Sequence, residues 1–350
     1  MTHSFLKSTA LALVATLAAG AASAQVNLTM ATASPGSMVH VTTHHLARVA
    51  GQRGVASLQV ADGQTLTNTV LDVAEGRMDI SESPMILPFM LSRGMGPYSS
   101  VENGAEVASR LRALYPFNAG AFNVYSLTSS GIESWEDLRG HTVFNGPPRG
   151  AALTNARQAV TLATGMEDGP DYTGFQANWG QINAMMTDGS VDAFVFPTNH
   201  PSDRIILMQA AGDVNVISVP QDVFESEAFQ RIFQVPGNIP IEWNFADFGY
   251  DDHVHLLGSD DGILRGMGTA FATVVNATMD EQLAYDLTSA HIETLDELRA
   301  SAPQAPSANH GDLDPVRSGF CGNNQLRYHP GAIRAWEDHG YTVPDCARPE

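Results

Sequence analysis

The sequence is almost without lysine. Of its 18 basic residues among 350, only Lys7 is a lysine and the others are arginines. Acidic residues number 38, which gives a formal net charge of −20. A protein that follows nucleic-acid phosphates needs a basic face, so this charge excludes a nucleic-acid partner. Schiff-base catalysis and phosphate-binding P-loops both need a lysine amine, and the chain beyond residue 7 has none.

Long apolar runs are also scarce, and the one near the start is short. Lys7 precedes an apolar run over 10–19, and small residues follow up to the Ala-Ser-Ala of 22–24. This order is typical of a secretory signal that is cleaved before Gln25. A membrane anchor is the alternative, but a span needs about 20 apolar residues. We therefore predict that residues 1–24 are a signal peptide and that the mature protein is exported.

Cysteine is rare, with two residues, Cys321 and Cys346, both near the end of the chain. In an oxidising compartment an even number of cysteines indicates a disulfide. A reactive or metal-binding thiol pair is the alternative, but the C-x-x-C spacing typical of such pairs is absent. We predict a structural disulfide, which the chain-entropy model values at roughly 3 kcal/mol.

Apolar segments alternate between strand-like and helical spacing along the chain, with glycines just beyond several helices. Such alternation predicts an α/β fold with parallel strands joined by helices. The stretch 300–309 is rich in Ser, Ala and Pro and is expected to be a surface loop. Strands are predicted over 26–31, 56–60, 78–81, 141–144 and 191–196, and helices over 39–51, 67–75, 154–164 and 181–187.

One pattern occurs in both halves of the chain. Gly76 and Asp79 stand in the same G-x-x-D-apolar order as Gly189 and Asp192, after a predicted helix and before a predicted strand. In each copy the glycine is expected to end the helix, and the aspartate to lie in the turn. The repetition suggests two similar α/β lobes. Ligands of such sheets bind at the carboxyl ends of the strands, so an exported binding protein is the first expectation.

Five short motifs follow one another over nearly the whole mature chain. They are S-P-G-S-M-V-H-V at 34–41, G-Q-T-L-T-N at 63–68, I-E-S-W-E-D-L-R-G at 132–140 with V-F-N-G at 143–146, D-G-S-V-D-A-F at 188–194 with N-H-P at 199–201, and H-P-G-A-I-R at 329–334 with Gly340. With the motifs in this order, the chain resembles the TAXI family. Members of that family are the extracytoplasmic solute receptors of one class of TRAP transporter.

The resemblance implies a type II periplasmic-binding-protein fold, in which two α/β lobes enclose a ligand cleft. Lobe one would contain residues 25–125 and 250–350, and lobe two residues 126–249. It also implies a monomeric periplasmic receptor, not an enzyme and without a cofactor. Such a receptor captures a small organic acid or amino acid and delivers it to TRAP membrane subunits. Ligand sensing for a signalling protein would use the same binding and stays open.

Glycine-rich loops before two predicted helices are suited to an anion, because helix N-termini present unpaired N–H groups. In the first loop the hydroxyl of Ser37 is expected to help orient the ligand. The resemblance matches Thr65 and Asn68 to polar residues of the family's second turn, and the same role is expected for them. Ordinary helix capping is the alternative for these side chains.

The chain departs from the family at two places. Val39 and His40 stand where the family carries paired tyrosines, and Arg149 and Gly150 stand where it carries G-S-G-T. His40, Arg149 and Gly150 are expected to be ligand residues. Arg149 is a candidate to bind a carboxylate or sulfonate through two hydrogen bonds. The alternative for Arg149 is an exposed arginine paired with an aspartate. Both departures leave the ligand class open.

Aromatic and amide residues later in the chain complete the candidate ligand site. Trp179, with Tyr172 and Phe175, is expected to cover the apolar part of a ligand, with a place in the core as the alternative. Asn199 is expected to reach the cleft from the end of a strand. The neighbouring His200 would shape the turn before Pro201.

Two histidine pairs keep a metal-binding alternative open. His40 and His44 share a helix face at i, i+4, and His253 and His255 share a strand face. An exported metal-binding protein or a metal-dependent hydrolase would use one of these pairs. The first pair lacks the glutamate of H-E-x-x-H, and no G-x-S-x-G motif occurs, so neither zinc-protease nor α/β-hydrolase chemistry is expected.

Overall fold

The computed structural model describes residues 25–148 and 150–349. The predicted signal peptide over 1–24 and the candidate ligand residue Arg149 lie outside these described residues. Within them, none of the helices is both long enough and apolar enough to cross a membrane.

The alternation of strands and helices is confirmed, and with it the α/β class. All nine predicted elements are present, with bounds that differ from the prediction by at most three residues. The strands are β1 (Val26–Ala31), β2 (Ala56–Ala61), β3 (Ile80–Pro84), β4 (Leu111–Leu127), β5 (Thr142–Phe144), β6 (Thr173–Phe175), β7 (Ala193–Thr198), β8 (Val214–Ile217), β9 (Asn238–Asn244), β10 (Val254–Leu257) and β11 (Ile263–Asn276). The α-helices are α1 (Met38–Gln52), α2 (Leu66–Ala74), α3 (Ile86–Ser92), α4 (Gly104–Ser109), α5 (Ala151–Thr164), α6 (Ile182–Asp188), α7 (Asp203–Met208), α8 (Gln221–Phe224), α9 (Glu227–Ile232), α10 (Glu281–Ile292), α11 (Leu295–Ser301) and α12 (Pro330–Asp338).

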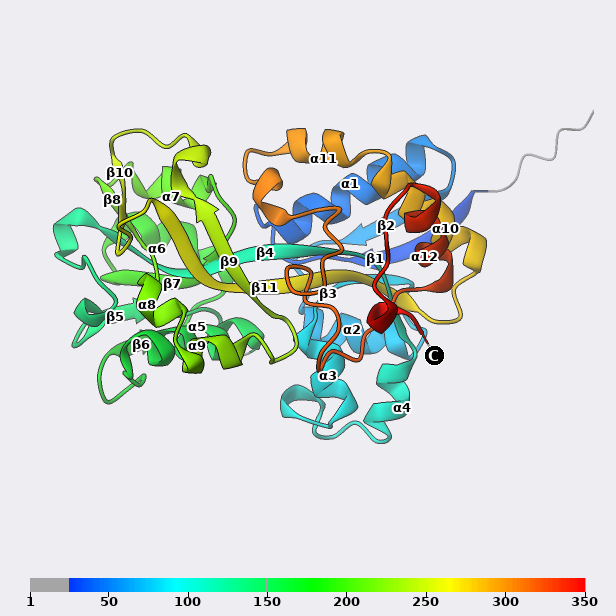
Figure 1. Cartoon of the computed structure of the whole chain (residues 1–350), viewed down its shortest axis with the longest axis horizontal. Coiled ribbons are helices and arrows are strands. Elements are labelled where there is room, and N and C mark those ends of the chain that lie inside the picture. Colours follow the sequence, from blue (N-terminus) through cyan, green and yellow to red (C-terminus); the bar gives the residue numbers. More distant parts are fainter. Residues whose placement is uncertain (1–24, 149, 350) are drawn as a thin grey trace, which may run out of the picture.

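Two groups of elements lie at the two ends of the molecule, and the long strands β4 and β11 run through both (Figure 1). In one group the strand order is β2-β1-β3-β11-β4, with β1, β2 and β3 parallel. In the other, β5, β6 and β7 are parallel, and β4 pairs with both β7 and β8 in antiparallel fashion. This arrangement agrees with the expected fold of the type II periplasmic-binding-protein kind.

Each group has its own hydrophobic core. The first core joins side chains from residues 28–121 with others from 239–347. Two further clusters join residues 122–267, among them Trp135 in one and Phe196 in the other. We call the elements around the first core the first lobe and those around the other two clusters the second lobe. The boundaries predicted near residues 125 and 250 stay a prediction.

The carboxyl ends of the parallel strands in each lobe point toward the other lobe. Thr198 at the end of β7 pairs with Ala121, where β4 leaves the first core. In the next turn, the backbone N–H of His200 donates to the hydroxyl of Ser307 in the first lobe, at 3.2 Å. At the end of β3, Pro84 pairs with Phe271 in the middle of β11. The two sets of strand ends therefore face each other, and ligands of parallel sheets bind at such ends.

The repeated G-x-x-D pattern has the same structural role in both lobes. Gly76 and Gly189 take left-handed backbone angles after α2 and α6, as helix-ending glycines do. Asp79 accepts a hydrogen bond from the backbone N–H of Thr29 at 2.7 Å, and Asp192 accepts one from the N–H of Thr142 at 2.8 Å. Each aspartate thus ties the turn before its own strand to a neighbouring strand.

The C-terminal segment confirms one prediction and corrects another. Cys321 and Cys346 form a disulfide, with their Cα atoms 5.3 Å apart. The expected surface loop over 300–309 is wrong, because Ala305 and Ala308 are completely buried in a short 3-10 helix. Small side chains gave this segment a loop-like composition, but they also allow it to pack closely against α1 and α11.

Candidate functional site

Ser37 ends the loop between β1 and α1, at the edge where the strand ends of the first lobe face the second. Gly36 before it has a positive φ of 83°, which glycine adopts without strain. The Ser37 hydroxyl donates to the carbonyl of Ser34 at 2.8 Å and accepts the backbone N–H of His40 at 3.2 Å. This is the capping alternative, and it occupies both functions of the hydroxyl. Ligand contact by Ser37 stays a prediction.

Thr65 and Asn68 begin the neighbouring helix α2, and both side chains are exposed. Thr65 is the N-cap residue, but its hydroxyl makes no capping hydrogen bond. We call the edge of the first lobe that faces the second lobe its rim. Because the Thr65 hydroxyl has no capping partner among the described residues, it is available to a solute at this rim. Its role in binding is untested.

His40, His44 and Asp62 form a cluster on the same rim. Asp62 follows β2, and both imidazoles lie on the face of α1 above it. The Nε2 atom of His44 lies 2.8 Å from Oδ1 of Asp62, and Nε2 of His40 lies 3.4 Å from the same oxygen. Partial burial, then the nearby His44, lowers the pKa of His40, while the hydrogen bond from His44 lowers the pKa of Asp62. Neutral imidazole and ionised carboxylate are the forms that bind metal ions.

The other histidine pair is arranged differently. His253 places Nδ1 2.9 Å from one carboxylate oxygen of Asp213, whereas His255 places Nε2 3.6 Å from the other oxygen. Among the described residues, the His40–His44–Asp62 cluster is the only group of three potential metal ligands whose ligand atoms all lie within 4.8 Å of one another.

In the second lobe, Gly150 precedes α5 with a positive φ of 105° and is exposed. The start of this helix is therefore accessible at the edge where β5 ends. The charge predicted for this loop belongs to Arg149, which lies outside the described residues, so its role stays a prediction.

Trp179 lies just before α6 and is partly buried against the second-lobe core. Its ring meets Phe144 edge-on, with centroids 6.0 Å apart. Of its predicted partners in a ligand wall, Tyr172 is buried in the core and Phe175 is exposed. The core alternative therefore describes Tyr172, while Trp179 keeps part of its surface free.

Arg204, which the sequence analysis did not single out, lies in the first turn of α7 beside Trp179. Its guanidinium carbon is 5.4 Å from the ring centre of Trp179 and 5.5 Å from that of Phe196. Burial lowers the pKa of Arg204 to about 10. With this pKa the guanidinium is charged at neutral pH, and among the described residues no carboxylate lies within salt-bridge distance of it.

Other described arginines that lack a carboxylate partner differ from Arg204. Arg112 and Arg327 donate to backbone carbonyls, and Arg93 is exposed just after α3. A partly buried charge without a partner carries a desolvation cost unless something else binds it. The stacking on two aromatic rings offsets part of that cost. Arg204 is therefore the strongest anion-binding candidate among the described residues.

Asn199 follows β7 and is buried where the lobes meet. Its side-chain N–H donates to Oδ1 of Asn118 at 2.9 Å, and Asn118 in turn donates to the carbonyl of Ser307 at 3.0 Å. His200 lies 2.8 Å from the hydroxyl of Tyr250, and burial lowers its pKa to about 3. The two asparagines join the lobes, whereas the contact between His200 and Tyr250 lies within the second lobe. The ligand role predicted for Asn199 stays untested.

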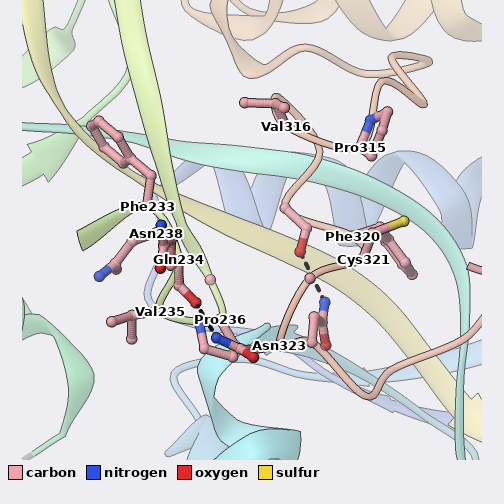
Figure 2. A pocket seen from close by; sticks show the side chains of 14 residues that line it. Phe233, Gln234, Val235, Pro236, Asn238, Pro315, Val316, Phe320, Cys321 and Asn323 are labelled. Carbon is pink, nitrogen blue, oxygen red and sulfur yellow. Dashed lines mark hydrogen bonds between the residues drawn. The ribbon is translucent and has the colours of Figure 1, made fainter. Parts of the chain in front are cut away.

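A cavity of about 370 Å³ lies where the segment before β9 meets the disulfide-bonded segment (Figure 2). The side-chain N–H of Asn323 donates to the carbonyl of Gln234 at 3.0 Å across this meeting point. The cavity offers amide and apolar groups and no charged side chain, so it does not suit an acid. None of the predicted ligand residues lines it; its walls are residues 233–238, Pro315, Val316 and residues 319–324.

Several solved structures are similar to this chain at low sequence identity. The periplasmic ectoine-binding protein of a TRAP transporter of Halomonas elongata is 13% identical, with 89% of this chain and 90% of that chain covered and a TM-score of 0.42. A TRAP periplasmic solute-binding protein of Desulfovibrio desulfuricans with bound sn-glycerol-3-phosphate is 12% identical, with 92% and 94% covered and a TM-score of 0.44. An extracytoplasmic solute receptor of Bordetella pertussis that binds pyroglutamic acid is 11% identical, with 90% and 92% covered and a TM-score of 0.43.

No curated protein matches the sequence. A family profile does match it, over residues 30–240, which is more than half of the chain. On this evidence, the protein belongs to the NMT1-like family.

Proposed function

We propose that the protein is a periplasmic solute receptor that captures a small organic anion between its two lobes and delivers it to a TRAP membrane transporter. The TAXI-like order of the five motifs supports this assignment within the family. The predicted export signal supports a periplasmic location, and the resemblance implies a monomer and a carboxylate ligand. The receptor would bind its solute without chemistry.

The observation that carries the proposal is Arg204. It follows β7, whose carboxyl end contacts the first lobe, and its charge has no described carboxylate partner. In a mature chain with a net charge of −21 (17 − 38, after loss of Lys7), long-range electrostatics repel an anion, and salt screens this repulsion beyond about 8–10 Å. Recognition must then be local. A guanidinium binds a carboxylate or sulfonate through two parallel hydrogen bonds, and Trp179 beside it provides a flat apolar surface.

The start of helix α1 complements this charge from the first lobe. Residues after the Ser37 cap present backbone N–H groups, and the helix dipole favours an anion there. The start of α5, after Gly150, offers the same groups in the second lobe. We propose that an acid bridges these helix starts and Arg204 when the lobes close, with Thr65 and Asn68 available to its polar substituents.

A binding screen followed by a matched pair of variants tests the proposal. Purified mature protein is screened by thermal shift in EDTA against mono-, di- and keto-acids, amino acids and sulfonates. An acid that binds the folded state raises the melting temperature. Calorimetry with that acid is then repeated for Arg204→Gln and for Arg231→Gln, an exposed arginine of the same lobe that is paired with Glu227.

We expect Arg204→Gln to lower affinity at least tenfold, which is the scale of one charge-assisted contact, and Arg231→Gln to leave it unchanged. Arg149→Ala tests the loop before α5 separately. A tenfold loss of affinity for the acid is also predicted for this variant. Equal affinity of wild type and Arg204→Gln would exclude Arg204 as the anion contact. Failure of every acid in the screen would contradict the receptor assignment itself.

A further inference from the structure

The rim of the first lobe carries a cluster of three potential metal ligands, His40, His44 and Asp62. His40 and His44 are four residues apart on α1, so both project from the same face of the helix. Asp62 follows β2, which pairs with β1 in parallel, and β1 leads through a short loop into α1. This topology brings the carboxylate under the two imidazoles, although 22 residues separate Asp62 from His40 (62 − 40).

The geometry of the cluster is that of converging ligands. Both Nε2 atoms approach one carboxylate oxygen, at 2.8 Å and 3.4 Å, and the two rings lie 4.2 Å apart between centroids. Ligands of a tetrahedral zinc ion with bonds of about 2.0–2.1 Å are separated by about 3.3 Å. Small side-chain rotations are therefore sufficient to place all three atoms around one ion.

The second histidine pair provides an internal comparison. It combines the same residue types, since His253 and His255 both approach Asp213. The two rings, however, lie near different oxygens of that carboxylate. The ligand atoms of these three residues do not all lie within 4.8 Å of one another, as they do in the first cluster. Composition alone therefore does not distinguish the two sites, whereas geometry does.

We infer that His40, His44 and Asp62 bind a divalent transition-metal ion of the zinc type on the rim of the first lobe. Two imidazoles and one carboxylate are a ligand set that suits Zn²⁺. Three protein ligands leave a fourth position open to water or to another donor. Because His44 and Asp62 are both partly exposed, the ion reaches the site without opening the fold.

Zinc binding to the mature protein tests the inference and does not depend on the transported solute. The protein is purified with a tag that contains no histidine, stripped with EDTA and dialysed. Zn²⁺ is then titrated in competition with a chromophoric chelator. We expect one ion per chain, with affinity lowered at least tenfold in His44→Ala and in Asp62→Asn. His253→Ala is the matched control and should bind zinc as wild type does.

A second measurement excludes indirect effects of the substitutions. Co²⁺ in place of Zn²⁺ should give visible absorption typical of four-coordinate sites in wild type and in His253→Ala, but not in His44→Ala. Far-ultraviolet circular dichroism in EDTA confirms that each variant is folded. Absence of zinc binding to wild type would overturn the inference. So would a loss of binding in His253→Ala with unchanged binding in His44→Ala. Neither result would affect the acid screen, which is carried out in EDTA.

Discussion

In the first lobe, buried ionisable side chains are neutral or bonded to hydroxyl groups, whereas in the second lobe the partly buried guanidinium of Arg204 lies beside two aromatic rings, with no described carboxylate within salt-bridge distance. Glu82 on β3 is completely buried between two threonines, and burial raises its pKa to about 8. Burial lowers the pKa of His45 to about 4 and that of His310 to about 3. Arg204 has no such arrangement around it.

Under the proposed function, the two interiors have different roles: the first lobe's interior stabilises the fold, and the second lobe's takes part in ligand recognition. Polar groups that satisfy one another inside a core fix its packing but offer nothing to a ligand. A charge without a partner contributes little to stability and is available to a solute of opposite charge. Under the proposed function, the first lobe is the scaffold in this comparison, and Arg204 in the second lobe would provide the charge for recognition. Changes at Arg204 should alter binding, and changes in the first-lobe interior should alter stability.

The largest expected effect in this comparison comes from Glu82→Gln in the first lobe. The Thr43 hydroxyl has one hydrogen to donate. Its oxygen nevertheless lies within hydrogen-bond distance of two oxygens, the carbonyl of Val39 at 2.9 Å and Oε1 of Glu82 at 3.0 Å. A protonated Glu82 resolves this, because it donates to Thr43 while its other oxygen accepts from Thr273 at 2.8 Å. Glutamine can make both bonds without ionising.

The sign of the pH dependence follows from the raised pKa. The folded state keeps a proton that the unfolded state releases above the ordinary value of 4.5, so the free energy of unfolding falls as pH rises to about 8. The total loss is on the order of 5 kcal/mol. We expect Glu82→Gln to match wild type near pH 5 and to be more stable at pH 8 in urea titrations. Glu136→Gln, an exposed second-lobe control, should keep the wild-type slope; equal slopes for Glu82→Gln would contradict a buried neutral carboxyl.

The next largest effect concerns the disulfide, which also belongs to the first lobe. Replacing Cys321 and Cys346 by serine removes a link across a separation of 25 residues, and should lower the free energy of unfolding by roughly 3 kcal/mol. The backbone N–H of Tyr328, inside the linked segment, donates to the carbonyl of Ala347 next to Cys346, so this region should gain the fastest hydrogen exchange. Exchange in β7 of the second lobe serves as the reference. An equal increase there would show that the lobes unfold as one unit.

The sequence was sufficient for the framework but not for the charges inside it. Hydrophobic spacing and helix-ending glycines located the nine predicted elements but not the long strands β4 and β11, and the repeated aspartates of 79 and 192 indicated two related lobes. Arg204 could not be recognised because its significance lies in the absence of a partner, which depends on where every described carboxylate ends up in space. Its neighbour Asp203 makes the sequence resemble an ordinary charged helix start.

Other missed features had weaker or misleading signals. Glu82 stands between two serines, a pattern typical of an exposed strand, and only the central place of β3 in the sheet buries it. Asp62 had a usable signal, since it follows a predicted strand that would lie beside the strand before the His40 helix. Parallel pairing of those two strands would have predicted the cluster. The segment 300–309 was misjudged from composition, which does not tell a tightly packed stretch of small residues from a loop.

The smallest expected effect compares the surfaces of the two lobes. Arg110 pairs with Glu106 on α4, and Arg231 pairs with Glu227 on α9, both at i, i+4 and both exposed. Exposed pairs of this kind contribute about 0.3–0.5 kcal/mol. Arg110→Ala and Arg231→Ala should therefore lower the free energy of unfolding by similar small amounts in urea titrations, and by less at high salt. If one variant lost several times more free energy of unfolding than the other, the surfaces of the two lobes would also differ. The contrast between Glu82 and Arg204 could then not be attributed to the interiors of the lobes alone.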